Sequence, residues 1–263
     1  MLYPLFGSPR LPKIEKSEPR NLRLSGTSMQ FAVPPFCIEW GRQRDWPDTF
    51  DIYDSSAFCK TEEQTAFLKC FESRWDLKGL PVWKTELGWI EFSITVFKLS
   101  ETGSAFNLRK FESDLLDQYA RLYGPMGTFN KHSFETFLDW SAQLINGNLW
   151  ISYHGRKHSV SDTSYQLVWE TPITDEHFIS VTFSYQNYKE KKTVHYAVEK
   201  FAQKIMTATH LDLSPSAQEQ KAAAEKQWPN QKYSEHMEPL RWIRPKKDFI
   251  SVEEYFADDD DDK

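Results

Sequence analysis

The sequence predicts an α+β fold in which an antiparallel sheet is layered against several helices. Three observations support this fold class. Several segments alternate apolar and polar side chains as strands do, others repeat apolar residues every three or four positions as helices do, and no βαβ alternation is sustained. A length of 263 residues, with 40% hydrophobic and 15% aromatic side chains, is enough to build a sizeable core.

The strands are predicted from alternation and from short apolar runs. Residues 29–33 and 49–53 predict two early strands, and residues 89–97 predict the clearest strand, with Ile90, Phe92, Ile94 and Val96 on one face. Residues 149–153, 165–170 and 177–185 follow one another as three further strands. Their spacing is typical of an antiparallel meander.

The helices are predicted from caps and apolar stripes. A capping box at residues 61–64 predicts a helix that places Phe67, Leu68, Phe71 and Trp75 on one side. Two more helices are predicted from Ser104 to Gly124, and from Ser133 to Asn146-Gly147. A helix over residues 193–209 and a polar helix that begins at Ser214-Pro215 complete the pattern.

These patterns divide the chain into four parts. Four prolines predict an extended N-terminal arm over residues 1–28, and residues 29–210 form a single α+β domain. Residues 211–252 are predicted to be a helical and irregular C-terminal extension. Residues 253–263 hold seven acidic side chains and one lysine, which accounts for the whole net charge of −6, and such a run is expected to be disordered.

Charge and cysteine content restrict the class of protein. Because the body outside the tail has no net positive charge, direct nucleic-acid binding is not expected. The three cysteines are odd in number and lack any C-x-x-C spacing, so neither a disulfide framework nor a zinc knuckle is indicated, and a reducing compartment is favoured. With no signal sequence or apolar span in sight, we expect a cytoplasmic protein that contacts no membrane.

No local motif for catalysis or for a cofactor is present. The sequence lacks G-x-S-x-G, H-E-x-x-H, a Walker-type loop and G-x-G-x-x-G, so we expect no enzyme activity, cofactor or metal. His154 and His158 would line up for a metal on a helix, but Gly155 and the preceding strand predict a hairpin turn. The carboxylate pairs Glu62-Glu63 and Asp114 with Asp117 are expected on solvated helix faces.

Two segments are candidates for partner binding. The first, residues 39–47, contains Trp40, Arg42, Arg44, Asp45 and Trp46, which include residue types enriched at binding hot spots. The alternative is that both tryptophans cover the edge of the core and the arginines pair with Asp45 and Asp48. The second is the aspartate run, with Asp258, Asp259 and Asp260, for which the alternative roles are to solubilise the chain or to form part of an enterokinase-type cleavage sequence.

Residues 29–210 resemble the Mog1/PsbP/DcrB group of α/β sandwiches. The resemblance is carried by Phe31-Ala-Val33-Pro34 at an early strand and by the helix containing Ala197 to Met206 after a late apolar strand. It implies an α/β sandwich, and the chain departs from the simplest form of that pattern by a long helical insert over residues 104–146 and by the C-terminal extension.

The compact, aromatic-rich and cofactor-free chain also resembles immunity proteins of bacterial type VI secretion. That resemblance implies a non-enzymatic protein that neutralises a cognate toxin, such as a nuclease effector, by stoichiometric binding. The alternatives are a hydrolase with a non-local active site, and an adaptor or chaperone for a secreted effector. The sequence leaves the oligomeric state open.

Overall fold

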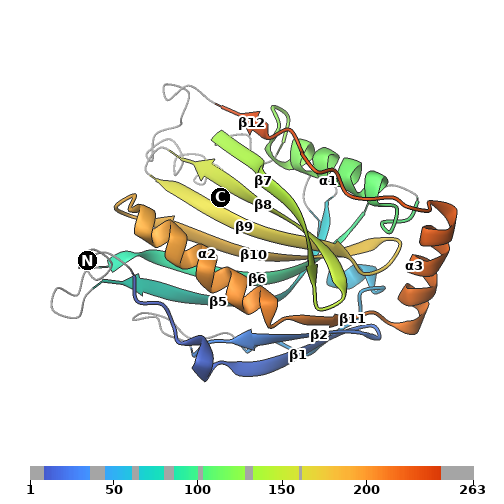
Figure 1. The fold of residues 1–263 in the computed structure, drawn as a ribbon, viewed down its shortest axis with the longest axis horizontal. Coiled ribbons are helices and arrows are strands. Elements are labelled where there is room, and N and C mark those ends of the chain that lie inside the picture. The colour runs from blue at the N-terminus through green and yellow to red at the C-terminus, as the bar shows by residue number, and fades with distance from the viewer. Residues whose placement is uncertain are drawn as a thin grey trace, which may run out of the picture.

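The fold is built on a large, curved antiparallel sheet, seen face-on in Figure 1. The computed structural model describes residues 9–35, 45–60, 65–79, 86–99, 103–127, 133–159 and 162–243. Across the sheet, the strands in these residues follow the order β12 (Leu240–Trp242), β7 (Ser133–Ile145), β8 (Asn148–His158), β9 (Thr163–Pro172), β10 (His177–Asn187), β6 (Glu86–Lys98), β5 (Ala66–Lys78) and β4 (Cys59–Lys60).

A smaller sheet lies below the large one in Figure 1. Its order is β11 (His210–Asp212), β2 (Thr27–Val33), β1 (Glu18–Leu24) and β3 (Thr49–Phe50). The helices are α1 (Leu108–Tyr123), α2 (Lys192–Thr207) and α3 (Pro215–Gln227), with short 3-10 turns η1 (Ile14–Lys16) and η2 (Ser55–Ala57). The β1–β2 hairpin turns at Ser25 and Gly26, whose φ angles of 47° and 96° suit a tight hairpin turn.

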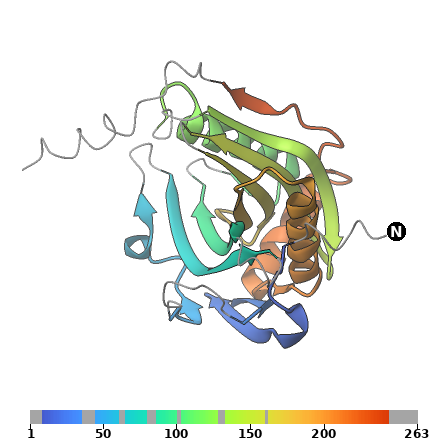
Figure 2. The same cartoon turned by 90° about the vertical axis from the view of Figure 1, so that its left-hand side faces the viewer.

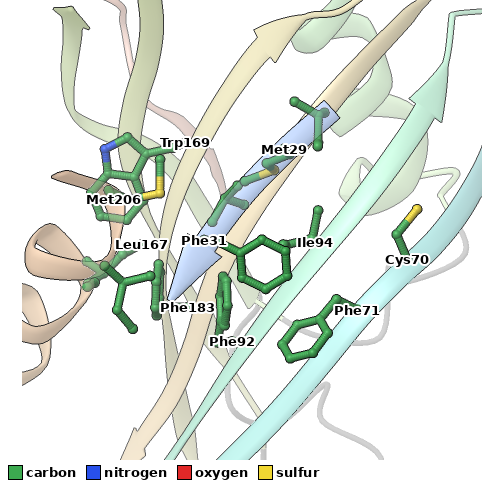
Figure 3. Packing of buried hydrophobic residues seen from close by; sticks show 14 of the residues in the cluster. Met29, Phe31, Cys70, Phe71, Phe92, Ile94, Leu167, Trp169, Phe183 and Met206 are labelled. Carbon is green, nitrogen blue, oxygen red and sulfur yellow. The ribbon is translucent and has the colours of Figure 1, made fainter. Parts of the chain in front are cut away.

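The large sheet is covered on both faces (Figures 1 and 2). On one face, α2 and the smaller sheet enclose the main core, where Phe31, Phe92 and Phe183 pack together (Figure 3). The rings of Phe92 and Phe183 stack with centroids 4.9 Å apart. On the other face, α1 and residues 228–243, which follow α3 and are called here the C-terminal segment, enclose a second core around Phe111 and Phe178.

Most of the predicted elements are confirmed, and the fold is an α+β fold with a large antiparallel sheet. The early strand, the clearest strand and the meander correspond to β2, β6 and β8–β10, while α1, α2 and α3 match three predicted helices. Ser214 caps α3 by accepting from the Ala217 N–H, as its sequence predicts. The predicted strand over residues 49–53 is reduced to β3.

The predicted helix after residue 64 is wrong, because this segment is the 13-residue strand β5. Its capping box lies outside the described residues. The stripe spacing of four between Phe71 and Trp75 is an even number, and therefore suits a strand as well as a helix. A bulge between Lys69 and Phe71 also buries the neighbours Cys70 and Phe71 together, which imitates helical spacing.

The predicted helix from Ser133 is also wrong, because these residues form β7. The register with β8 shifts twice, between Glu135 and Leu138 and between Leu138 and Ser141, so the buried positions do not alternate. Asn146 and Gly147, predicted to end a helix, form the β7–β8 hairpin turn with φ angles of 46° and 85°. Asn-Gly is the favoured pair for such a turn.

Three smaller expectations also differ from the structure. His154 and His158 do not lie on a turn, since both belong to β8. Asp114 does not lie on a solvated face, because it is 5% exposed on α1 and forms an ion pair with Lys110. Within the segment predicted as an extended arm, β1 pairs with β2 along its whole length and buries Leu22 and Leu24.

Candidate partner-binding groove

A groove runs between α2 and the strands β7, β8 and β9 of the large sheet. It consists of two hollows of about 400 and 450 Å³. Asp139, His154, Leu167 and Glu199 line both hollows, which therefore adjoin along a common border. We call the whole feature the α2 groove. Its combined size falls within the range of sites that hold a ligand or a peptide segment.

The first hollow, which we call the aromatic hollow, has an apolar floor and a polar rim. Leu167 and Trp169 of β9 are 2% and 5% exposed and form part of its floor. Gln143 of β7 links the floor to the rim, since its Nε2 donates to Ser152 Oγ at 2.9 Å and its Oε1 accepts from the Trp169 indole at 3.5 Å. On the opposite wall Tyr196 projects from α2 with 66% of its surface exposed.

The second hollow, which we call the charged hollow, is lined by aromatic rings and by charges of both signs. Tyr165 stacks on Tyr185 with centroids 5.3 Å apart, and His195 meets the Tyr165 ring edge-on at 4.6 Å. The Tyr165 hydroxyl donates to Glu190 Oε2 at 2.7 Å. Burial raises the pKa of Tyr165 to about 12, and burial likewise raises the pKa of Tyr185. Both phenols are therefore neutral at physiological pH.

The position of Asp139 depends on the irregular backbone of β7. Asp139 has a φ of 54°, in the left-handed region that aspartate tolerates better than most residues. Because two register shifts surround Leu138, Asp139 lies at the border of the two hollows. Its Oδ2 is 3.2 Å from Nδ1 of His154 on the neighbouring strand. Bulges that redirect a side chain in this way are frequent beside functional sites.

The histidines of the groove contact a carboxylate, a tyrosine hydroxyl and an asparagine amide. His195 Nδ1 is 2.9 Å from the Tyr185 hydroxyl, and its Nε2 is 3.1 Å from Asn187 Nδ2. Among the residues that the structure describes, neither His154 nor His195 is hydrogen-bonded to a serine, threonine or cysteine. In the same residues, no group of three His, Cys, Asp or Glu side chains has an arrangement that could hold a metal ion.

The most strongly shifted acid and imidazole pKa values belong to core residues instead. Burial raises the pKa of Glu170 to about 7, although Tyr153 donates to its Oε2 at 2.8 Å. Burial lowers the pKa of His177 to about 4. Neither residue lines the aromatic or the charged hollow.

The residues predicted for partner binding are only partly placed. Trp46 is 7% exposed and its indole donates to the Glu72 carbonyl at 3.0 Å, so it covers the core, which was the alternative role. Asp45 is exposed, and Asp48 pairs with Arg20 at 3.3 Å. The remaining predicted residues lie outside the described part of the chain: Trp40, Arg42, Arg44, Asp258, Asp259 and Asp260.

Apart from His154, which was considered as a metal ligand, the groove residues were not singled out from the sequence, although α2 carries a signal for them. Its apolar stripe of Val194, Val198, Phe201 and Ile205 is buried. The opposite stripe presents Tyr196, Glu199, Lys200 and Gln203 to the groove. An exposed tyrosine amid charged side chains on an amphipathic helix is a detectable signal, whereas the pairing of Asp139 with His154 required the register of two strands.

Comparisons with known proteins give little further information. No family model matches the chain, and no curated protein matches it significantly. A solved structure described as LpqN, involved in cell envelope biogenesis of Mycobacterium tuberculosis, is similar with 12% identity and a TM-score of 0.33, covering 76% of this chain and 92% of that one. A likeness at this level supports neither a fold assignment nor a function. None of the described helices has the length and apolar character that crossing a membrane requires.

Proposed function

We propose that this protein acts by stoichiometric binding of a protein partner, and that the α2 groove receives a segment of that partner. One observation carries the proposal: two adjoining hollows form an open groove with walls from α2 and from several strands. The groove combines an apolar floor, an exposed tyrosine and charges of both signs. Such a combination is typical of surfaces on which a few anchors hold a protein chain.

The class of partner that we propose is a toxin or effector, which the protein would neutralise as an immunity protein does. Support comes from the compact, aromatic-rich chain without catalytic motifs. A protein that neutralises a toxin by covering its working surface needs only a surface complementary to it, and no catalytic residues. The charged side chains that line the groove would fix the position of the toxin segment along it. We also propose that the protein is located in the cytoplasm and that its sheets and helices are layered as in the Mog1/PsbP group.

The two alternative functions have less support. A hydrolase with a serine, threonine or cysteine nucleophile would need that group beside a base, whereas neither groove imidazole is hydrogen-bonded to such a residue within the described part of the chain. An adaptor or chaperone for an effector predicts a largely apolar groove. The α2 groove instead includes the side chains of Asp139, Arg156, Glu190, Glu199 and Lys200.

Neutralisation can be tested in cells of the source organism that carry or lack the gene. Cells without the gene should be inhibited by wild-type neighbours, and expression of the intact chain should protect them. The matched variants are Tyr196→Ala in the groove and Tyr188→Ala outside it, which remove tyrosines that are 66% and 52% exposed. Loss of a central anchor should weaken partner capture about tenfold or more.

The two variants give opposite expectations. Tyr188→Ala should protect cells and capture the partner as the wild-type chain does, while Tyr196→Ala should do neither. Equal capture by both variants would show that the groove is not the binding surface. Absence of any stoichiometric partner, together with normal survival of cells lacking the gene, would refute the proposed function.

A further inference from the structure

The charged hollow has the chemistry of a site for an organic cation. Its floor includes the stacked rings of Tyr165 and Tyr185, which are fixed in place by bonds at their hydroxyls. The Tyr165 hydroxyl is bound to Glu190 at 2.7 Å, and the Tyr185 hydroxyl is 2.9 Å from His195. Neutral phenol rings held in a fixed orientation present negative π faces, which attract lysine and arginine side chains.

One of these rings already binds a cation. The guanidinium carbon of Arg156 lies 5.6 Å from the centre of the Tyr165 ring. The charge of Arg156 is only partly balanced from outside the hollow, because its Nη1 is 3.5 Å from Glu135 Oε2 and Glu135 also pairs with Arg241 at 3.3 Å. Arg156 therefore contributes positive charge to the hollow. Burial has the larger effect and raises the pKa of both Tyr165 and Tyr185, and this charge acts to lower it.

The remaining charges of the hollow are mostly acidic. Asp139, Glu190 and Glu199 line it, against the exposed Lys192 and the two imidazoles of His154 and His195. Asp139 and Glu190 contact those imidazoles at 3.2 and 3.6 Å. Glu199 has no basic partner among the residues that the structure describes, and it is close enough to Tyr185 to contribute, after burial, to raising the pKa of that phenol.

We propose that the charged hollow binds the side chain of a lysine or arginine on the partner's segment, an inference that rests on the proposed function. The three carboxylates of the hollow outnumber its two fixed cations, Arg156 and Lys192, so an anionic side chain would be repelled. An apolar side chain would bury those carboxylates without compensating them. A cation gains from the aromatic rings and from Glu199 together, and the aromatic hollow next to it would take an apolar neighbour in the same segment.

The test uses the intact chain and a small probe, Nα-acetyl-arginine amide, with the neutral citrulline analogue as the matched probe. Binding is followed by NMR line-broadening and saturation transfer to the probe. The arginine probe should bind and the citrulline probe should bind about tenfold more weakly. Glu199→Gln, on the exposed side of α2, should weaken arginine binding by about twofold to fivefold.

Two further variants test whether arginine binding depends on the charged hollow or only on the acidic charge of the chain as a whole. Tyr165→Leu removes a ring and should abolish the preference for arginine, whereas Glu225→Gln, at an exposed position on α3, should leave it unchanged. Equal binding of both probes, or equal losses in Glu199→Gln and Glu225→Gln, would overturn the inference. If Tyr165→Leu fails to fold, Glu199→Gln still decides the outcome.

The proposed function and this inference can fail separately. Capture of a partner that depends on Tyr196 but is unaffected by Glu199→Gln, with no arginine preference in the probe assay, would overturn the inference and leave the function standing. Arginine-selective binding without any captured partner would refute the function, while the hollow would still be a cation site.

Discussion

The two cores that flank the large sheet differ in the side chains that they bury. The main core, between the sheet, α2 and the smaller sheet, is formed almost entirely by apolar side chains such as Trp75, Phe92 and Ile94, each fully buried. The second core, beneath α1, also buries ionisable groups: Glu112, Asp114 and Glu170 are 4%, 5% and 2% exposed. We call the main core the dry layer, because it buries almost no polar side chain, and the second core the polar layer.

The polar layer is organised as short chains of hydrogen bonds. The hydroxyls of Tyr119 and Tyr153 are 2.8 Å apart, and Tyr153 donates onward to Glu170. Near the surface of the same layer, Glu112 accepts from the backbone and the hydroxyl of Ser234, which holds the C-terminal segment against α1. Directional bonds of this kind specify which segments dock where, while apolar burial supplies most of the free energy.

The largest effect is expected from opening a cavity in the dry layer. Phe92 contacts Phe31, Phe71 and Phe183 with centroids 4.9 to 5.7 Å away. Phe92→Ala should lower the free energy of unfolding by about 3 to 5 kcal/mol. Because the side chains around it do not titrate, the loss measured by urea unfolding should be the same at about pH 5 and about pH 8. A loss that changes with pH would contradict the separation of the two layers.

The next largest effect concerns Glu170 in the polar layer. Burial raises its pKa from 4.5 to about 7, so the folded state holds the proton more tightly than the unfolded state does. Its contribution to stability is fully present below pH 4.5 and is lost as the pH rises to about 7. Glu170→Gln removes the titration. The variant should match the wild type near pH 4.5 and exceed it by about 3 kcal/mol at about pH 8.

The comparison of variant with wild type is needed because another buried group titrates in the opposite direction. The pKa of His177 is lowered to about 4, mainly by burial, so its contribution to stability is lost as the pH falls from 6.5 towards 4. His177 is present in both proteins and cancels in the difference. A difference between the two unfolding free energies that stays constant across this pH range would show that Glu170 does not titrate as described.

A smaller and local effect is expected at Glu112. Glu112→Ala leaves the Ser234 N–H and hydroxyl without their carboxylate, and hydrogen bonds to charged groups are worth about 1.5 to 3 kcal/mol. The C-terminal segment should open more often. Amide hydrogen exchange should therefore speed up at residues 231–236, while amides of β6 in the dry layer keep their protection. Equal acceleration in β6 would mean that the segment does not open independently.

The sequence predicted those parts of the fold in which one period dominates. The strand β6 alternates without interruption, and α1, α2 and α3 each have an apolar stripe or a recognisable cap. The strands β5 and β7 were missed because their bulges place consecutive residues, such as Cys70 with Phe71, on the buried side. Periodicity describes a regular element, and a bulge changes the phase of the pattern without leaving a local mark.

The groove was harder to predict for a related reason. Asp139, Tyr165 and Glu199 come from three different elements, and only the strand register and the packing of α2 bring them to one hollow. The position of Asp139 also depends on a left-handed backbone that the helix prediction for this segment excluded. By contrast, the outer stripe of α2 was present in the sequence, because its polar residues repeat opposite the buried ones.

The smallest effect on stability should come from the groove itself. Tyr196 is 66% exposed on the outer side of α2, so Tyr196→Ala should change the free energy of unfolding by less than about 0.5 kcal/mol. Two positions along the same helix, Val198 is fully buried against the dry layer, and Val198→Ala should cost about 2 kcal/mol. Thermal and urea unfolding of both variants measure the contrast. Comparable losses in the two would mean that Tyr196 is a packing residue of the main core, and the dry layer would then extend into the α2 groove.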